Sequence, residues 1–303
     1  MISVVLPSAE MRDRLADRFG DASVSVWRPG DPGAPTDPVE LLVLPYMIPP
    51  VQLRQLDGLP IAVVQSQTLG HDGVGEHLPS GIAYCNATDV HEGSTAELAL
   101  GLILAAQRGI PDAVRDAAGG IWDHRRRPGL AGKRMLLIGV GGVGTEIIAR
   151  VAPFGVDLDL VARTARHGVH GTESLPELLP RADIVVVAVP LVEETRRLVD
   201  APFLAAMRDE ALLVNVSRGE VVDTDALVAQ LRTGRLRAAL DVTDPEPLPP
   251  QHPLWTLPGV LITPHVGGDT DAMDDRVDAV IIEQVRRLRA GTRPLNLVHP
   301  AGR

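Results

Sequence analysis

Two series of short apolar segments run along this chain, and each series alternates with polar or amphipathic stretches. In the first part of the chain, we expect strands at residues 2–6, 24–27, 41–45, 61–65 and 82–86. A second series is expected at residues 135–138, 158–161, 184–189, 211–216, 238–242 and 260–263. Short apolar runs that alternate with helical patterns are typical of βα units. The pattern therefore predicts an α/β fold with parallel sheets, the second of them doubly wound with its ligand at the carboxyl ends of the strands.

Helical segments and loops separate these strands. Residues 94–108 are apolar on nearly every side, so we expect a helix that is buried between domains or between subunits. Ser94 and Glu97 have the spacing of a capping box at its start. Residues 271–290 predict an amphipathic helix that ends at Gly291. The expected loops are the Pro- and Gly-rich residues 29–38 and the polar, Gly-rich residues 111–133.

A glycine-rich turn follows the first strand of the second series. The apolar run Leu136-Leu137-Ile138 leads directly into Gly139-Val-Gly-Gly-Val-Gly144, and a helical pattern comes next. In a dinucleotide-binding turn, the first glycine permits the tight turn, the second lets the backbone approach a pyrophosphate, and the third lets helix and strand pack closely. The N–H groups at the start of the helix then hold the anion. The flanking strand and helix favour a dinucleotide site over an ordinary βα turn.

Charge and cysteine content exclude several classes of function. The 303 residues carry a formal net charge of −10, and the one basic run that stands out is Arg125-Arg126-Arg127. We interpret these arginines as a solvated surface or a subunit contact, and expect no nucleic-acid partner. Cys85 is the only cysteine, so we expect neither an intrachain disulfide nor a metal site. The first residues have the pattern of a strand rather than a signal peptide, and no apolar run is long enough to cross a bilayer, so we expect a cytoplasmic protein without a membrane partner.

Three ionisable residues lie just beyond the last three strands of the second series, where the ligands of a doubly wound sheet bind. They are Arg218, Glu246 and His265. A guanidinium can hold a carboxylate through two parallel hydrogen bonds, and a histidine can transfer a proton to or from a hydroxyl group. A carboxylate behind the histidine would orient the ring and favour the imidazolium during reduction. Each residue alone is more often a surface or capping residue, but the set, downstream of a dinucleotide turn, favours nicotinamide-dependent redox chemistry.

Longer motifs make the chain resemble the D-isomer-specific 2-hydroxyacid dehydrogenase family over essentially its full length. The motifs that carry the resemblance are Gly139-Val-Gly-Gly-Val-Gly144, Leu178-Leu-Pro-Arg-Ala-Asp-Ile-Val-Val-Val-Ala-Val-Pro190 with Glu194-Thr195, Leu213-Val-Asn-Val-Ser-Arg-Gly219 with Val222-Asp223, Leu240-Asp-Val242 with Glu246-Pro247, and Pro253-Leu-Trp255 leading to Thr263-Pro-His265. The resemblance implies a Rossmann cofactor domain at residues 93–272 and a flavodoxin-like substrate domain formed by residues 1–92 and 273–303. It also implies a homodimer, which the apolar helix 94–108 favours as well.

The resemblance implies roles for individual residues. Arg218 would bind the substrate carboxylate, His265 would be the acid/base, and Glu246 would partner His265. Residues 64–72 look like the family's substrate loop, in which backbone N–H groups near Leu69 and Gly70 would meet the carboxylate. The expected cofactor contacts are Gly139, Gly141, Gly142, Val143, Gly144, Arg163, Thr164, Arg166, Val189, Pro190, Thr195, Val216, Ser217, Asp241, His265 and Gly267.

The residues at the end of the second strand of the cofactor domain indicate whether NAD or NADP is bound. NAD enzymes place an acidic residue there to bind the ribose 2′-hydroxyl, but Ala162 occupies this position. The residues that follow include Arg163, Thr164 and Arg166. Two cations and a hydroxyl suit the 2′-phosphate of NADP. Asp159 is the rival ribose contact, because it lies about 20 residues past Gly139, but three strand residues follow it. The sequence therefore favours NADP and leaves NAD open.

We expect a reductase that transfers a hydride from NADPH to a small 2-oxoacid, such as glyoxylate or hydroxypyruvate, and forms the D-2-hydroxyacid. Two departures from the family pattern are a shortened stretch at residues 234–240 and His71 in the substrate loop, where the family usually has an apolar residue. His71 leaves the choice of substrate open. One alternative keeps the fold but oxidises another small anion, such as phosphite. The other is a dinucleotide-sensing scaffold similar to the family's transcriptional corepressors.

Overall fold

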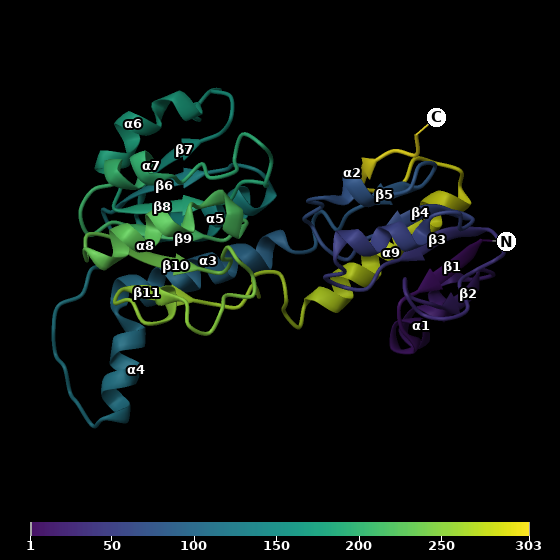
Figure 1. Ribbon diagram of the computed structural model, residues 1–303, viewed down its shortest axis with the longest axis horizontal. Helices are drawn as coiled ribbons and strands as arrows, with labels where there is room; N and C mark the ends of the chain where they lie inside the picture. The colour runs from purple at the N-terminus through teal and green to yellow at the C-terminus, as the bar shows by residue number, and fades with distance from the viewer. Residues whose placement is uncertain (1, 303) are drawn as a thin grey trace. The chain divides into compact units, whose positions relative to one another are not determined.

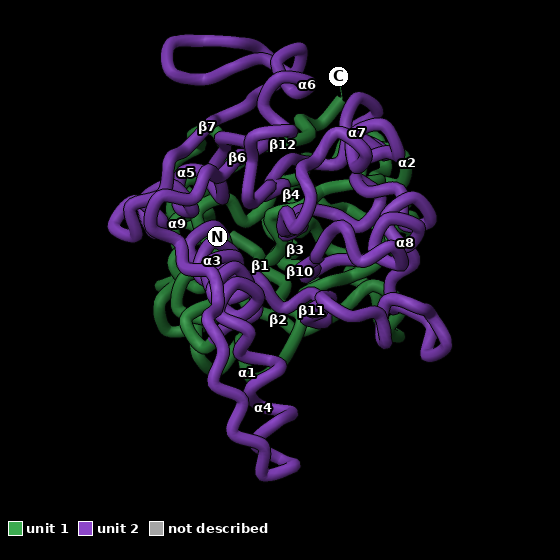
Figure 2. The backbone as a smooth tube through the Cα atoms, turned by 90° about the vertical axis from the view of Figure 1, so that its left-hand side faces the viewer, with its two compact units in different colours: residues 1–91, 271–303 green, residues 92–270 purple. Residues whose placement is uncertain are grey.

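The computed structural model describes residues 2–302 and divides the chain into two compact units. Unit 1 consists of residues 1–91 and 271–303, and unit 2 consists of residues 92–270 (Figure 2). The chain therefore leaves unit 1 once, after His91, and returns to it at Asp271. The sequence placed these two crossings one and two residues further along. The assignment of substrate and cofactor roles to the two units stays a prediction.

Unit 1 is a six-stranded sheet with helices (Figure 1). Its elements are β1 (Ser3–Leu6), α1 (Ala9–Leu15), η1 (Ala16–Phe19), β2 (Ser23–Val26), β3 (Val39–Val43), η2 (Pro50–Leu56), β4 (Ile61–Gln65), α2 (Val74–His77), β5 (Ala83–Cys85), α9 (Met273–Arg289) and β12 (Leu297–His299). The strand order is β12-β5-β4-β3-β1-β2, and every pair is parallel except β12 with β5. The first five strands thus follow the flavodoxin-like order 2-1-3-4-5.

Both faces of the unit 1 sheet are buried, because side chains alternate between the faces along each strand. Val4 and Leu6 of β1 pack in one apolar cluster with α1 and with Ile281 of α9. Val5, between them, packs in a second cluster with Leu53 of η2. Burial on both faces explains why β1, β3 and β4 are near-continuous apolar runs that are visible in the sequence.

Unit 2 contains a second six-stranded sheet, which is parallel throughout. Its elements are α3 (Glu92–Arg108), α4 (Ile110–Ala118), β6 (Arg134–Ile138), α5 (Gly142–Val151), η3 (Ala152–Phe154), β7 (Asp157–Val161), η4 (Thr172–Ser174), α6 (Leu175–Leu178), η5 (Leu179–Arg181), β8 (Ile184–Val187), α7 (Ala201–Ala206), β9 (Leu212–Asn215), η6 (Gly219–Val221), α8 (Thr224–Arg232), β10 (Arg237–Leu240), η7 (Pro253–Trp255) and β11 (Val260–Ile262). The strand order β11-β10-β9-β8-β6-β7 places the switch point between β6 and β8. This is the doubly wound sheet that the sequence predicts.

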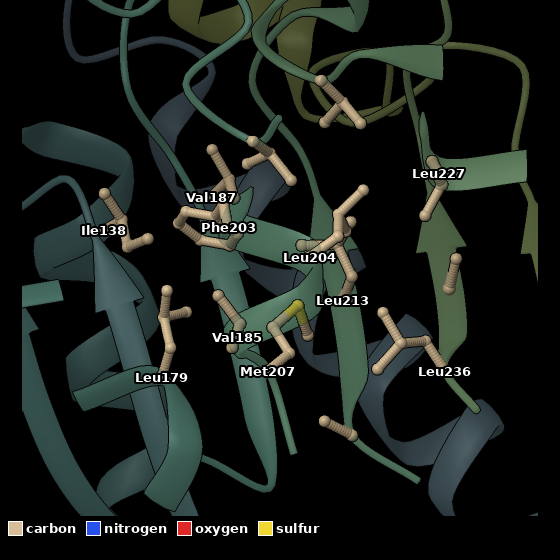
Figure 3. Close-up of a cluster of buried hydrophobic side chains, with 14 of the residues drawn as sticks. Ile138, Leu179, Val185, Val187, Phe203, Leu204, Met207, Leu213, Leu227 and Leu236 are labelled. Atoms are coloured by element: carbon tan, nitrogen blue, oxygen red, sulfur yellow. The ribbon is translucent and has the colours of Figure 1, made fainter. Parts of the chain in front are cut away.

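Helices cover both faces of the unit 2 sheet. On one face, Val185, Val187 and Leu213 pack against Phe203 and Leu204 of α7, together with side chains of α6 and α8 (Figure 3). On the other face, α3 and α5 cover the alternate residues of the same strands. Full burial of a leucine or phenylalanine stabilises a fold by roughly 1.5–3 kcal/mol, so these two clusters hold the strand ends that form the candidate site rigidly in place.

All of the expected strands are present, each within two residues of its predicted bounds, but the helices required corrections. Helix α3 begins at Glu92, so Ser94 lies inside it, and the Ser94 hydroxyl bonds that of Thr270 at 3.1 Å. The capping box was therefore wrong. The helix packs on α5 within the core of unit 2, while Glu97 is exposed.

Two elements were not expected from the sequence. Part of the predicted loop 111–133 is helical, because α4 runs from Ile110 to Ala118 and extends away from the sheet of unit 2 (Figure 1). Strand β12 adds an antiparallel edge to the unit 1 sheet beside β5. Helix α9 is shorter than expected at its start, but it is followed by Gly291 at φ +64°, where glycine is the residue that adopts this conformation without strain.

Candidate active site

The register of the unit 2 sheet brings its strand ends into a single row. Ile138 of β6 pairs with Val161 of β7 and with Val187 of β8. Val187 in turn pairs with Asn215 of β9, and Asn215 with Leu240 of β10. Residues that directly follow these strands therefore lie along one edge of the sheet. The predicted cofactor and catalytic residues of unit 2 fall mainly in these connections.

The glycine turn has the geometry that its sequence predicts. Gly139 has φ +104°, and a Cβ there would lie 2.2 Å from the Ala188 carbonyl oxygen. A Cβ on Gly144 would lie 2.1 Å from the Gly139 carbonyl oxygen, so helix α5 and strand β6 approach too closely for any side chain. Gly141 is the N-cap of α5, and a Cβ there would have no neighbour within 4 Å. The turn is thus tightly packed at Gly139 and Gly144, and has open space at Gly141.

A dinucleotide fits this turn. The first N–H groups of α5, which include those of Gly142 and Val143, belong to a helix start that has no side-chain cap. Such groups, with the helix dipole, attract an anion. The open space at Gly141 leaves room for a pyrophosphate to approach the backbone. The role of these residues in cofactor binding stays a prediction.

The residues after β7 form an exposed cationic turn. Arg163, Thr164 and Arg166 are all exposed, and the Arg166 N–H donates to the Val169 carbonyl at 2.9 Å. Asp159, the rival ribose contact, is the third residue of β7 and pairs with Leu136. Its carboxylate lies 3.8 Å from a terminal nitrogen of Arg134. Asp159 thus lies two residues before the end of β7 and close to Arg134.

Loops after β8 and β9 are ordered by their own polar side chains. The Thr195 hydroxyl donates to the Pro190 carbonyl at 2.6 Å, which closes the loop that begins at Val189. After β9, the Ser217 hydroxyl donates to the Asn215 carboxamide oxygen at 2.7 Å, and the Asn215 amide donates to the Arg218 carbonyl at 2.9 Å. Asn215 therefore fixes the backbone that presents Arg218. This role is not evident from the sequence, because an asparagine at a strand end has no distinctive motif.

His265 and Glu246 form a hydrogen-bonded pair. The Nδ1 atom of His265 lies 2.5 Å from the Glu246 Oε1 atom, and the two side chains are 26% and 38% exposed. Burial raises the pKa of the Glu246 carboxyl, but the hydrogen bond with His265 and the positive charges of His265 and Arg218 outweigh it. The pKa therefore lies below its ordinary value, and Glu246 is a carboxylate at neutral pH. The Arg218 charge contributes to this lowering, and a terminal nitrogen of its guanidinium donates to the Ser217 carbonyl at 2.7 Å.

Asp241 holds the loop that carries His265. Its carboxylate is 3% exposed and accepts hydrogen bonds from the Thr263 hydroxyl at 2.6 Å, the Val266 N–H at 3.0 Å and the Gly267 N–H at 2.9 Å. His265 itself has φ +54°, a conformation that costs a non-glycine residue free energy and persists only when neighbours impose it. Thr263 and Asp241 thus fix His265 in a strained backbone, a contribution of Thr263 that the sequence analysis did not identify.

The predicted substrate loop lies in unit 1, directly after β4. The N–H groups of Leu69, Gly70 and His71 have no hydrogen-bond acceptor among residues 2–302. Successive unpaired N–H groups can bind an anion such as a carboxylate. His71 is exposed, and its ring meets that of His299 edge-on with 5.6 Å between the ring centres. The substrate role of this loop stays a prediction.

The site in unit 2 therefore combines the glycine turn at the start of α5, the hydrogen-bonded pair of His265 and Glu246, and the guanidinium of Arg218. Such a set can hold a dinucleotide, orient a carboxylate and transfer a proton. Among the described residues, no three histidine, cysteine or acidic side chains gather in a way that could hold a metal ion. None of the described helices has the length and apolar character needed to span a membrane.

Comparison with known proteins supports the same chemistry. Residues 100–267 match the model of the D-isomer specific 2-hydroxyacid dehydrogenase, NAD binding domain. The chain is 34% identical to the human glyoxylate reductase/hydroxypyruvate reductase over 284 residues, which cover 86% of both proteins. It is 36% identical over 230 residues to a D-3-phosphoglycerate dehydrogenase from Methanocaldococcus jannaschii, but this match spans only 43% of that longer protein.

Solved structures with the same fold include two dehydrogenases. A D-isomer specific 2-hydroxyacid dehydrogenase from Xanthobacter autotrophicus, in complex with NADPH and MES, has a TM-score of 0.83 and 31% identity and covers 98% of both chains. An NADPH-dependent glyoxylate/hydroxypyruvate reductase from Sinorhizobium meliloti, in complex with citrate, has a TM-score of 0.83 and 25% identity, again with 98% of both chains covered. The chain therefore belongs to the D-isomer-specific 2-hydroxyacid dehydrogenase family of NAD(P)-dependent oxidoreductases.

Proposed function

We propose that this protein reduces a small 2-oxoacid, of the glyoxylate or hydroxypyruvate kind, to the D-2-hydroxyacid with NADPH. The observation that carries the proposal is the 2.5 Å contact between His265 and Glu246, with the charge of Arg218 beside it, at the strand edge that also bears the glycine turn. The similarity to glyoxylate/hydroxypyruvate reductases supports the choice of substrate class.

Different residues would act on the carboxylate and on the carbonyl group of the substrate. The Arg218 guanidinium would pair with the substrate carboxylate and so orient its carbonyl group. A reduced dinucleotide whose pyrophosphate is held at the glycine turn would supply the hydride from its nicotinamide. The His265 Nε2–H would donate its proton to the oxygen that was the carbonyl oxygen, because Nδ1 is engaged with Glu246. The Glu246 carboxylate would stabilise the imidazolium before the transfer and hold its ring plane throughout.

The loop in unit 1 would itself provide donors to a substrate carboxylate. Its unpaired N–H groups at Leu69 and Gly70 carry no charge, so they would contribute geometric selection rather than long-range attraction. Typical hydrogen bonds to an ionised group contribute roughly 1.5–3 kcal/mol each. The loop would therefore favour 2-oxoacids over neutral carbonyl compounds.

We propose that NADPH is preferred over NADH. The support is the exposed turn after β7, which presents Arg163, Thr164 and Arg166 and no carboxylate at the strand end. Two charge-assisted hydrogen bonds to a 2′-phosphate would favour NADPH by roughly 3 kcal/mol, which corresponds to about a hundredfold in Kd. Asp159 lies two residues before the end of β7, so it would lie away from the strand end where the ribose 2′-position is expected.

A second copy of this chain is the partner that we propose. Helix α4 has no buried residue, and the segment from Ile110 to Trp122 exposes several large apolar side chains. These are Ile110 (49%), Val114 (65%), Ile121 (60%) and Trp122 (95%). An exposed apolar stretch of this kind is typical of an interface. The proposed location remains the cytoplasm, which a lone buried Cys85 suits.

The proposed function is tested with a panel of 2-oxoacids that contains glyoxylate, hydroxypyruvate, pyruvate and 3-phosphohydroxypyruvate, each assayed with NADPH and with NADH. We expect turnover of glyoxylate and hydroxypyruvate with NADPH. The matched variant Arg218→Ala should lose turnover of these acids while its Kd for NADPH stays within about twofold. If the wild-type protein binds NADPH tightly but turns over no 2-oxoacid, the reductase proposal is wrong and a sensing scaffold is favoured.

A further inference from the structure

The unpaired N–H groups of the substrate loop belong to peptide groups whose carbonyl oxygens are all engaged. The Thr68 carbonyl accepts from the Ala87 N–H at 2.9 Å, and the Leu69 carbonyl accepts from the Asn86 amide at 2.8 Å. The Gly70 carbonyl accepts from the Thr68 hydroxyl at 3.1 Å. Donors thus hold three successive carbonyls, while the N–H groups on the same peptide planes have no acceptor among residues 2–302.

Each hydrogen bond to a carbonyl of the loop also fixes the direction of the N–H on the same peptide plane. In a planar trans peptide, the C=O of one residue and the N–H of the next point in opposite directions. A donor that fixes the Leu69 carbonyl therefore also aims the Gly70 N–H away from that donor. The Thr68 hydroxyl, by holding the Gly70 carbonyl, aims the His71 N–H in the same manner. The loop presents donors because the Ala87 N–H, the Asn86 amide and the loop's own Thr68 hydroxyl hold its acceptors.

The side chain of Asn86 is itself held so that its NH₂ group faces the Leu69 carbonyl. Its side-chain oxygen accepts from the Thr88 hydroxyl at 2.8 Å and from the Thr88 N–H at 3.3 Å. Because both partners are donors, the oxygen of the carboxamide must face Thr88, and the NH₂ group must face the Leu69 carbonyl. Asn86 is 5% exposed and follows β5, so water does not compete strongly for this amide.

We propose that Asn86 and Thr68 are positioning residues that aim the N–H groups of Gly70 and His71 at the substrate carboxylate, and that the His71 N–H is a third donor of this anion site. The inference rests on the proposed 2-oxoacid reductase function and extends it to residues that touch no substrate. Without the two side chains, the peptide groups of the loop would be free to turn. The loop would then need to be ordered each time that a substrate binds.

The predicted consequence is a loss of substrate affinity with little change in the chemical step. Asn86→Leu removes the amide and approximately keeps the volume. Thr68→Val replaces the hydroxyl with a methyl group, which removes its bond to the Gly70 carbonyl and its 2.8 Å contact with the Ser66 hydroxyl. A lost hydrogen bond of about 1.4 kcal/mol corresponds to tenfold in an equilibrium constant. We expect KM for glyoxylate, and Kd for oxamate, a non-reducible analogue, to rise about tenfold in Asn86→Leu and about fivefold in Thr68→Val. The value of kcat should change less than threefold.

The control for this experiment is Thr292→Val. The Thr292 hydroxyl also donates to a backbone carbonyl in unit 1, that of Arg287 at 3.1 Å, but it lies outside the loop. We expect its KM and its Kd for oxamate to match those of the wild-type protein. All variants should bind NADPH with a Kd within twofold of the wild-type value, which separates a local effect from general loss of folding.

The outcomes separate this inference from the function on which it rests. If Thr68→Val folds and binds oxamate as tightly as the wild-type protein, or if Thr292→Val weakens oxamate binding equally, the positioning roles are refuted while the reductase function stands. If the wild-type protein neither turns over a 2-oxoacid nor binds oxamate, the reductase proposal fails and this inference fails with it. Should Asn86→Leu not fold, Thr68→Val alone decides.

Discussion

The exchange of Glu246 for glutamine is the most informative perturbation of the proposed proton donor. Glutamine keeps the size of the side chain and an oxygen that can accept from His265 Nδ1, whose present partner is the Glu246 Oε1 atom at 2.5 Å. What it removes is the negative charge. The expected effect is therefore electrostatic, and it should be visible in how activity depends on pH rather than in a uniform loss.

The structure sets the size of this effect. Charge centres roughly 4 Å apart interact by about 4 kcal/mol at an effective dielectric constant of about 20. The two side chains are 26% and 38% exposed, so solvent screening reduces the interaction to roughly 1–2 kcal/mol. Since about 1.4 kcal/mol corresponds to one pH unit, Glu246→Gln should move the alkaline limb of kcat/KM about one unit toward lower pH.

The assay is kcat/KM for glyoxylate with NADPH from pH 5.5 to 9.5. We expect Glu246→Gln to lose about tenfold at pH 8.5 and much less at pH 6, because at low pH the imidazolium forms without help from a carboxylate. Glu177→Gln, at an exposed position of α6, serves as the control and should follow the wild-type curve. A Glu246→Gln profile that is unshifted, or lowered equally at every pH, would refute the electrostatic role.

Three further predictions concern cofactor choice, stability and assembly. Arg163→Ala should raise KM for NADPH about tenfold and KM for NADH less than twofold, because only NADPH carries the 2′-phosphate; equal effects in steady-state assays would contradict the proposed 2′-phosphate site. Burial and the nearby charge of His71 hold the pKa of His299 below 6.5, so its folded pKa lies under its unfolded one. The stability that this provides is present above pH 6.5 and is lost as the pH falls through the folded pKa. Between pH 7 and 5, the free energy of unfolding measured with urea should therefore fall more for the wild-type protein than for His299→Phe. An equal fall in both proteins would contradict this effect of His299. Val114→Lys with Trp122→Lys should shift the mass measured by light scattering from two chains to one, whereas a wild-type protein that is already monomeric would rule out the α4 interface.

Much of the fold was predictable because its strands are buried on both faces. Such strands are short continuous apolar runs, and their alternation with helical patterns distinguishes parallel sheets. The edge strand β12 was missed because it pairs antiparallel with β5, a strand far away in the chain, and so stands outside the alternation of parallel strands and helices. Helix α4 was missed although Ile110 and Val114 have helical spacing, because Pro111 and Gly119-Gly120 at its two ends are typical of a loop. The start of α3 was misplaced because Ser94 bonds Thr270, a contact that local sequence does not encode.

The candidate site was predictable where a residue type and its place at a strand end suffice. The glycine turn, Arg218, Glu246 and His265 all lie where parallel strands end, so the sequence pattern predicts their neighbourhood. The supporting bonds were not predictable, because they join residues far apart in the chain. Thr263 bonds the Asp241 carboxylate 22 residues away, and Asn86 bonds the Leu69 carbonyl 17 residues away. Asparagine and threonine at such positions have no motif, and only the folded backbone shows what they hold.

The most direct test of the central claim is to follow the hydride itself. NADPH that carries deuterium at the transferable C4 position is incubated with hydroxypyruvate and the wild-type protein, and the product is analysed by mass spectrometry and chiral chromatography. We predict glycerate with one deuterium at C2 and only the D configuration, and no labelled product from His265→Ala. Unlabelled, racemic or L-glycerate, or full activity in His265→Ala, would contradict the account.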